Sequence, residues 1–119
     1  MTYTVLPVTD ARRQAFSLEV SPDGIPLQAW VEIVWLRGIG RWVLSLRDLG
    51  SGELLVNRIP LLGSEKVSDD LLYPFRHLRQ GRGLGSLFCL KRVPDFGSRD
   101  PSADTLTGFQ ILWGDTIHG

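Results

Sequence analysis

Residues 14–36 read QAFSLEVSPDGIPLQAWVEIVWL, two alternating runs joined by a turn. In the first run Phe16, Leu18 and Val20 alternate with small or polar residues, and this period of two is typical of a half-buried strand. Pro22 sets its own φ angle, and the Asp-Gly pair that follows tolerates left-handed backbone, so residues 21–24 predict a hairpin turn. The stretch therefore predicts two antiparallel strands and, with them, a β fold.

The second run, residues 25–36, is apolar on both of its faces. One face carries Leu27, Ala29, Val31, Ile33 and Trp35, and the other carries Gln28, Trp30, Glu32, Val34 and Leu36. Antiparallel sheets normally leave one face in water. A strand of this kind is therefore expected either at the centre of a closed barrel or beneath a partner.

Alternating segments continue on both sides of this hairpin, at residues 3–6, 41–46, 54–59, 86–93 and 109–113. Seven short strands separated by turn formers predict an all-β fold, a small antiparallel β-barrel or sandwich, with the barrel favoured. The alternation stops between residues 59 and 86. Within this break, residues 69–80 predict one short helical or irregular excursion, with Asp69 and Asp70 as a helix start. Residues 94–107 predict a long exposed loop.

Composition limits the class of protein. The 119 residues fit a single domain spanning residues 1–119, and 13 basic against 13 acidic residues give no net charge. General attraction to nucleic acid or to an anionic membrane is therefore not expected. The single cysteine, Cys89, excludes an intramolecular disulfide and a thiolate metal cluster. No signal peptide or membrane-spanning run is present, so we expect a protein made and kept in the cytosol until assembly.

The chain shows no local catalytic motif. No nucleophile elbow, metal-ligand spacing or pair of carboxylates is found. The glycine-rich residues 81–85 precede a strand, whereas a phosphate-binding loop precedes a helix, so they predict a turn. We predict no enzyme and no catalytic, cofactor-binding or metal-binding residue. Because catalytic sets assemble from distant positions, an enzyme that uses His77 stays a third-ranked alternative.

Arginine and tryptophan suggest contacts with a partner. Eleven of the 13 basic residues are arginines, which pair with carboxylates and are preferred in interfaces. The tryptophans fit a core and an interface equally well; they are Trp30, Trp35, Trp42 and Trp113.

Residues 71–94 contain five basic side chains and no carboxylate. This basic patch, with its neighbouring aromatic rings, is expected to meet carboxylates on another protein. The alternative is a small nucleic-acid-binding module of oligonucleotide-barrel type, in which cations neutralise phosphates and rings stack on bases. The predicted protein-interface residues are Tyr73, Phe75, Arg76, Arg79, Arg82 and Trp30.

Five short motifs in one collinear order resemble the phage baseplate plug family, typified by the cyanophage plugs of contractile-tailed phages. They are YTVLP at residues 3–7, WVLSL at 42–46, IPLLG at 59–63, LLYP at 71–74 and GLGSLF at 83–88. Residues 100–106 resemble the polar loop that this family tends to have before its last strand. The resemblance covers nearly the whole chain, and its weight lies in the succession of motifs.

The resemblance implies a non-enzymatic β protein in the virion, held in the central part of the tail baseplate and made in the host cytoplasm. Its expected partners are other baseplate proteins, namely the hub and the tail tube, with the spike as a further candidate. Several copies arranged by the symmetry of the tail are implied, so a homo-oligomer within the assembly is expected. No cofactor, no membrane and no catalytic residue is implied. Packing against other subunits would also cover sheet edges that otherwise favour aggregation.

Overall fold

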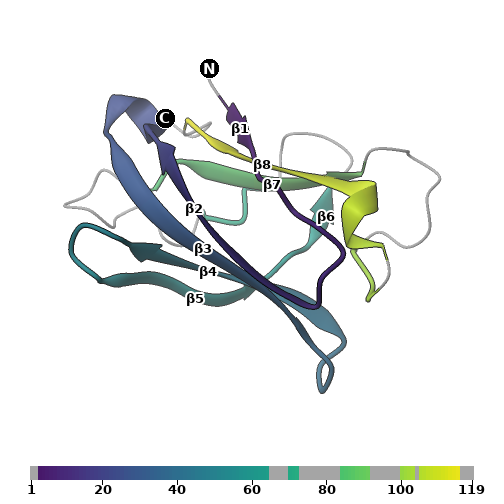
Figure 1. Ribbon diagram of the computed structural model, residues 1–119. Coiled ribbons are helices and arrows are strands. Elements are labelled where there is room, and N and C mark those ends of the chain that lie inside the picture. The colour runs from purple at the N-terminus through teal and green to yellow at the C-terminus, as the bar shows by residue number, and fades with distance from the viewer. Residues whose placement is uncertain (1–2, 65–69, 73–83, 92–99, 104, 116–119) are drawn as a thin grey trace.

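The computed structural model describes residues 3–64, 70–72, 84–91, 100–103 and 105–115. Its strands form two sheets that face each other (Figure 1). The first sheet has the order β1-β8-β7-β6, with bounds Tyr3–Val5, Phe109–Gly114, Ser86–Lys91 and Gly63–Ser64. The second sheet has the order β2-β3-β4-β5, with bounds Arg13–Val20, Leu27–Leu36, Arg41–Asp48 and Leu54–Pro60. Two 3-10 turns, η1 (Pro22–Gly24) and η3 (Leu106–Gly108), precede β3 and β8.

The all-β class is confirmed, and its architecture is a sandwich. The closed barrel that the sequence favoured does not form among the described strands, where no pairing joins β1 to β2 or β5 to β6. The short strand β6, which the alternation did not predict, pairs with β7 in parallel. The remaining described pairings are antiparallel, as expected.

The hairpin predicted within residues 14–36 forms. Asp23 and Gly24 both have positive φ angles, 56° and 80°, which is the left-handed pair expected of this turn. Strand β2 pairs with β3 over its full length, from Arg13 opposite Val34 to Val20 opposite Leu27. Strand β3 then pairs with β4 across a second hairpin.

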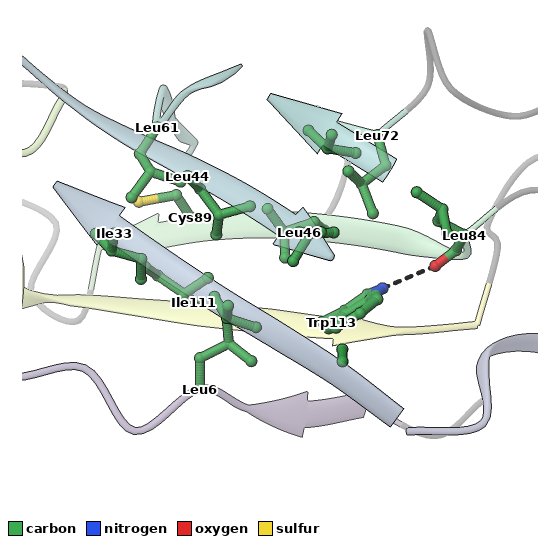
Figure 2. Close-up of a cluster of buried hydrophobic side chains, with 14 of the residues drawn as sticks. Leu6, Ile33, Leu44, Leu46, Leu61, Leu72, Leu84, Cys89, Ile111 and Trp113 are labelled. Carbon is green, nitrogen blue, oxygen red and sulfur yellow. Dashed lines mark hydrogen bonds between the residues drawn. The ribbon is translucent and has the colours of Figure 1, made fainter. Parts of the chain in front are cut away.

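The core lies between the two sheets (Figure 2). The inward face of β3 supplies residues that are at most 4% exposed, and they are Leu27, Ala29, Val31 and Ile33. From the first sheet, Cys89, Ile111 and Trp113 meet them, each fully buried. The indole Nε1–H of Trp113 donates to the carbonyl oxygen of Leu84 at 2.7 Å, so this buried polar atom has a partner. The face of β3 on which alternation groups Leu27, Ala29, Val31 and Ile33 is thus the face that packs inward.

Residues before β8 are held against the sandwich, so the predicted exposed loop is wrong for most of the described part of it. The Asp100 carboxylate accepts the Gly63 amide at 2.8 Å and forms a 2.5 Å ion pair with Arg41. The Trp42 indole donates to the Ser102 carbonyl at 2.6 Å. Leu106 adds a fully buried side chain to the core. Polar composition predicted exposure here, but the buried indole of Trp42 needs an acceptor and finds it in this segment.

Asp70 has a different setting from the predicted helix start. Residues 70–72 are irregular and include a turn, and Asp69 and residues 73–80 lie outside the described part of the chain. The Asp70 carboxylate accepts the amides of Leu72 at 2.9 Å and Leu87 at 3.0 Å, and the hydroxyl of buried Ser86 at 2.9 Å. Asp70 therefore attaches this irregular segment to the start of β7.

Candidate protein-interaction surface

The outer face of the second sheet, the side turned away from the core, carries rows of aligned side chains that cross all four strands, and one of them contains Trp30. Ser17 lies opposite Trp30, Trp30 opposite Arg47, and Arg47 opposite Leu54. We call Trp30, Arg47 and Leu54 the central row. Since β2 to β4 are joined by tight turns, the strands stay in register and this alignment follows from the pleat.

The central row combines exposed apolar surface with a positioned cation. The Trp30 side chain is 38% exposed and that of Leu54 is 42% exposed. Between them, the Arg47 guanidinium donates from Nη1 to the Gly52 carbonyl at 2.6 Å. A pocket of about 190 Å³ opens beside the row, lined by Trp30, Glu32, Ser45, Leu46, Arg47, Leu54, Asn57 and Arg58. Exposed tryptophan and arginine are the residue types most often found at the energetic centre of protein interfaces.

The shape of this pocket depends on an irregularity in β5. The register between β4 and β5 shifts between Leu44 and Leu46, so two β5 residues face one residue of β4. Arg58 adopts a positive φ of 52° there, and its amide donates to the Ser45 hydroxyl at 3.0 Å. Asn57 and Arg58 are consequently both exposed, and both line the pocket. A bulge of this kind redirects side chains on one strand.

Charges on the outer face are mixed in sign. Arg47 and Arg58 lie in the same pocket as Glu32, whose carboxylate is 3.8 Å from the guanidinium of Arg13. The Arg13 side chain is 68% exposed, so this ion pair contributes little to stability. A surface with both signs fits a partner that also carries both signs better than it fits a polyanion.

Two apolar residues on the outer face are buried but lie outside the main cluster of core side chains. Val34 and Val43 lie opposite each other, with exposed fractions of 8% and 2%. Their row continues to Arg13 on one side and Pro60 on the other. This row explains part of the two-sided apolar pattern of β3 without a barrel, whereas Trp30 stays exposed.

Of the six interface residues predicted from the sequence, Trp30 is described and lies on the outer face. The other five fall outside the described residues, and they are Tyr73, Phe75, Arg76, Arg79 and Arg82. Arg47 and Leu54 were not singled out by sequence reasoning. Counting back from the turn at residues 37–40 would have placed Arg47 opposite Trp30, but the bulges in β5 leave no comparable signal for Leu54.

A second pocket, of about 290 Å³, lies at one end of the sandwich. It is lined by Thr4, Val20, Ser21, Pro22, Gly24, Trp113, Gly114 and Asp115. The Asp115 carboxylate accepts the Asp23 amide at 2.8 Å, and the Trp113 indole is bonded to Leu84. These contacts join the η1 turn to β8, which indicates a structural role.

The described residues offer little reactive chemistry. No three His, Cys, Asp or Glu side chains among them are grouped as a metal site requires. Both histidines of the chain, His77 and His118, lie outside the described ranges. Burial, with a smaller effect from the Asp100 carboxylate, raises the pKa of the Cys89 thiol to about 12. This thiol is therefore protonated at neutral pH and is not a nucleophile. Within the described residues, no helix has the length and apolarity needed to cross a bilayer.

We expect Cys89 to react with a thiol reagent such as Ellman's reagent at pH 8 roughly 1,000-fold more slowly in the folded protein than in urea, because the folded chain holds almost no thiolate. The raised pKa favours the protonated thiol, so the reaction should accelerate as pH rises towards 12. Absorbance of the released thiolate reports the rate. Rapid labelling of the folded protein at pH 8 would show that Cys89 is not enclosed as described.

Comparison of this chain with protein-family models and with curated proteins finds no match. The resemblance to the baseplate plug family is therefore carried by the five collinear sequence motifs. The candidate interaction surface on the outer face of the second sheet does not depend on this resemblance, because it is defined by exposure, register and charge.

Proposed function

We propose that this chain is a non-catalytic structural subunit of a tailed-phage baseplate. In this role it is a plug or adaptor in the central hub region, and it links the hub to the tail tube during tail assembly, host attachment and DNA ejection. Two independent features support the proposal. The motifs at residues 3–7, 42–46, 59–63, 71–74 and 83–88 occur in the order expected of a plug, and the sandwich presents a face suited to a protein partner.

The observation that carries the proposal is the exposed central row, Trp30, Arg47 and Leu54. An adaptor must keep its core intact while offering apolar surface to a neighbour, and the sheet does both with its opposite faces. On the inner face of β3, Val31 and Ile33 are fully buried, while Trp30 between two inward positions is 38% exposed. Covering the ring and Leu54 would remove apolar area from water, and Arg47 supplies a donor for a carboxylate or carbonyl.

The mixed charge of this face favours the protein partner over the nucleic-acid alternative. A strand of nucleic acid presents a continuous row of phosphates, which Glu32 in the lining of the pocket would repel. A protein surface can place a cation opposite Glu32 and a carboxylate opposite Arg47 or Arg58. The hub and the tail tube are the partners that the sequence resemblance supports.

We expect Trp30→Ala to weaken binding of this chain to hub and tail-tube proteins from the same genome by roughly 30-fold, as truncation of an interface anchor does. Unfolding free energy should fall by less than about 1 kcal/mol, because the side chain lies outside the core. Co-expression followed by light scattering and titration calorimetry measures both the complex and its affinity. The matched control is Ile39→Ala, which removes an apolar side chain that is 62% exposed at the β3–β4 turn.

Two negative results have different meanings in this experiment. If the unaltered chain forms no complex with either protein, the proposed baseplate role is wrong. If Trp30→Ala binds as tightly as the Ile39→Ala control, the role stands and the assignment of the central row to the interface fails.

A further inference from the structure

Strand β2 lies at one edge of the second sheet. It pairs with β3 on one side, and among the described strands it has no neighbour on the other (Figure 1). The Trp35 amide donates to the Arg12 carbonyl at 2.7 Å, which marks residues 12 and 35 as a hydrogen-bonded pair. Backbone groups alternate in direction along an antiparallel strand, so the even-numbered residues of β2 face β3. The odd-numbered residues, Arg13, Ala15, Ser17 and Glu19, therefore direct their amides and carbonyls outward.

This edge differs from the other described sheet margins in its length and regularity. Strand β5, at the opposite margin of the same sheet, is interrupted by two register shifts and ends on Pro60. At the margins of the first sheet, β1 has three residues and β6 has two. Short strands, bulges and proline are among the devices that prevent strand-to-strand association, as are charged side chains, which β2 does carry at Arg13 and Glu19. Strand β2 has eight residues in unbroken register and no proline.

The charges of this edge are complementary to those of a second copy. When two β2 strands run antiparallel about a two-fold axis at Phe16, Arg13 of one copy lies opposite Glu19 of the other, at both ends of the contact. Ala15 then lies opposite Ser17, so only small side chains meet between the two ion pairs. Arg13 and Glu19 are both exposed, and among the described residues no ion pair is made by Glu19. Opposite charges facing each other across strands are stabilising, and like charges are destabilising.

We propose that this protein forms a two-fold symmetric dimer through β2, which joins two second sheets into one continuous eight-stranded sheet. In this register each of the four residues whose backbone groups point outward lies opposite such a residue of the second copy. Each of the four pairs exchanges two backbone hydrogen bonds, roughly eight in total. Sliding the strands by two residues leaves three such pairs and places neither arginine opposite a glutamate. The backbone and the charges thus select the same register.

The apolar side of β2 also changes in this dimer. Phe16 lies on the two-fold axis, so its ring meets the ring of Phe16 in the second copy, and Leu18 lies opposite Gln14. Phe16 and Leu18 are only partly buried in the single chain and pack against the margin of the core. Pairs of aromatic side chains that face each other across strands add to sheet stability. The dimer would extend the core at its open margin, and it stands independently of the proposed baseplate role.

Sedimentation velocity over a concentration series tests the proposal, with paired charge reversals to test the register. Arg13→Glu and Glu19→Arg each place like charges at both ends of the contact, so each variant alone should associate at least roughly 10-fold more weakly than the unaltered chain. Mixed in equal amounts, the two variants restore both opposite-charge pairs and should form a heterodimer. The chain that carries both substitutions should dimerise with itself. Arg37→Glu, which makes the same charge change at the exposed β3–β4 turn, serves as the control.

Arg13→Glu also removes the 3.8 Å contact with Glu32 within the chain. Glu19→Arg is therefore the variant that tests the contact between the two copies alone. Circular dichroism should show both single variants folded. At about 1 mM protein, even a dimer with a millimolar dissociation constant would be half-formed. A protein that is still monomeric at this concentration would overturn the proposed dimer. A dimer that the single reversals leave unchanged, or that their mixture does not restore, would overturn this register.

Discussion

Gly85→Ala is expected to destabilise the fold by about 4 kcal/mol or more, which is beyond the ordinary range for a single substitution. Gly85 has a φ of +84°, a conformation that a side chain disfavours. A Cβ at this position would also collide with the backbone carbonyl of Gly114 and lie 2.7 Å from the Cβ of Pro22. The first obstacle is backbone of β8, so no rotation of a side chain can relieve it. Urea unfolding followed by tryptophan fluorescence measures the loss.

Gly52→Ala separates the two causes. Gly52 has a comparable φ of +77°, but an added Cβ there has no atom within 4 Å. The cost should therefore be that of the left-handed backbone alone, about 1–2 kcal/mol. Equal losses in the two variants would show that β8 does not lie against Gly85 as described.

Trp113→Ala is expected to lower the free energy of unfolding by about 3–5 kcal/mol, the range for removal of a large aromatic side chain from a packed core. Trp113 is fully buried, and it contacts both the core and the segment that leads into β7 through its bond to Leu84. Trp113→Phe keeps most of the apolar volume but leaves the Leu84 carbonyl without its indole donor, which should cost about 1–3 kcal/mol. Chemical denaturation of both variants gives the two numbers.

The exposed Trp30 provides the comparison for Trp113. Both are tryptophans on β-strands, so their truncations differ mainly in burial. If Trp113→Ala and Trp30→Ala had equal effects on unfolding, the assignment of one to the core and the other to the surface would be wrong. If Trp113→Phe were as stable as the unaltered protein, the hydrogen bond to Leu84 would make no net contribution to the free energy of unfolding.

Local periodicity predicted much of this fold. Alternation placed seven strands near their observed positions and grouped Leu27, Ala29, Val31 and Ile33 on one face of β3, which the structure shows to be the inward face. Turn chemistry at Asp23 and Gly24 predicted the β2–β3 hairpin, because positive φ angles are a local property of those residues. Trp30 was predicted at an interface; it is exposed on the outer face, and its binding role stays a proposal.

Long-range features could not be predicted in the same way. Whether the sheets close into a barrel depends on the margins β1, β2, β5 and β6, which are far apart in the sequence, and local alternation is the same in a barrel and a sandwich. The positive φ at the bulge belongs to Arg58 rather than to a glycine, so the sequence does not predict it. Asp100 and Ser102 read as loop residues, yet their acceptors bind Arg41 and the Trp42 indole about sixty positions away in the chain. These contacts join residues far apart in the chain, and no local sequence motif predicts them.

We propose that this sandwich is an assembly subunit that binds a baseplate neighbour. The mass of the particle formed when the chain is co-expressed with the hub and tail-tube proteins of its genome tests this most directly. Native mass spectrometry of the purified complex should show the chain at a fixed ratio to at least one of the two proteins. Recovery of the hub and the tube in complex with each other, with this chain left free, would contradict the claim.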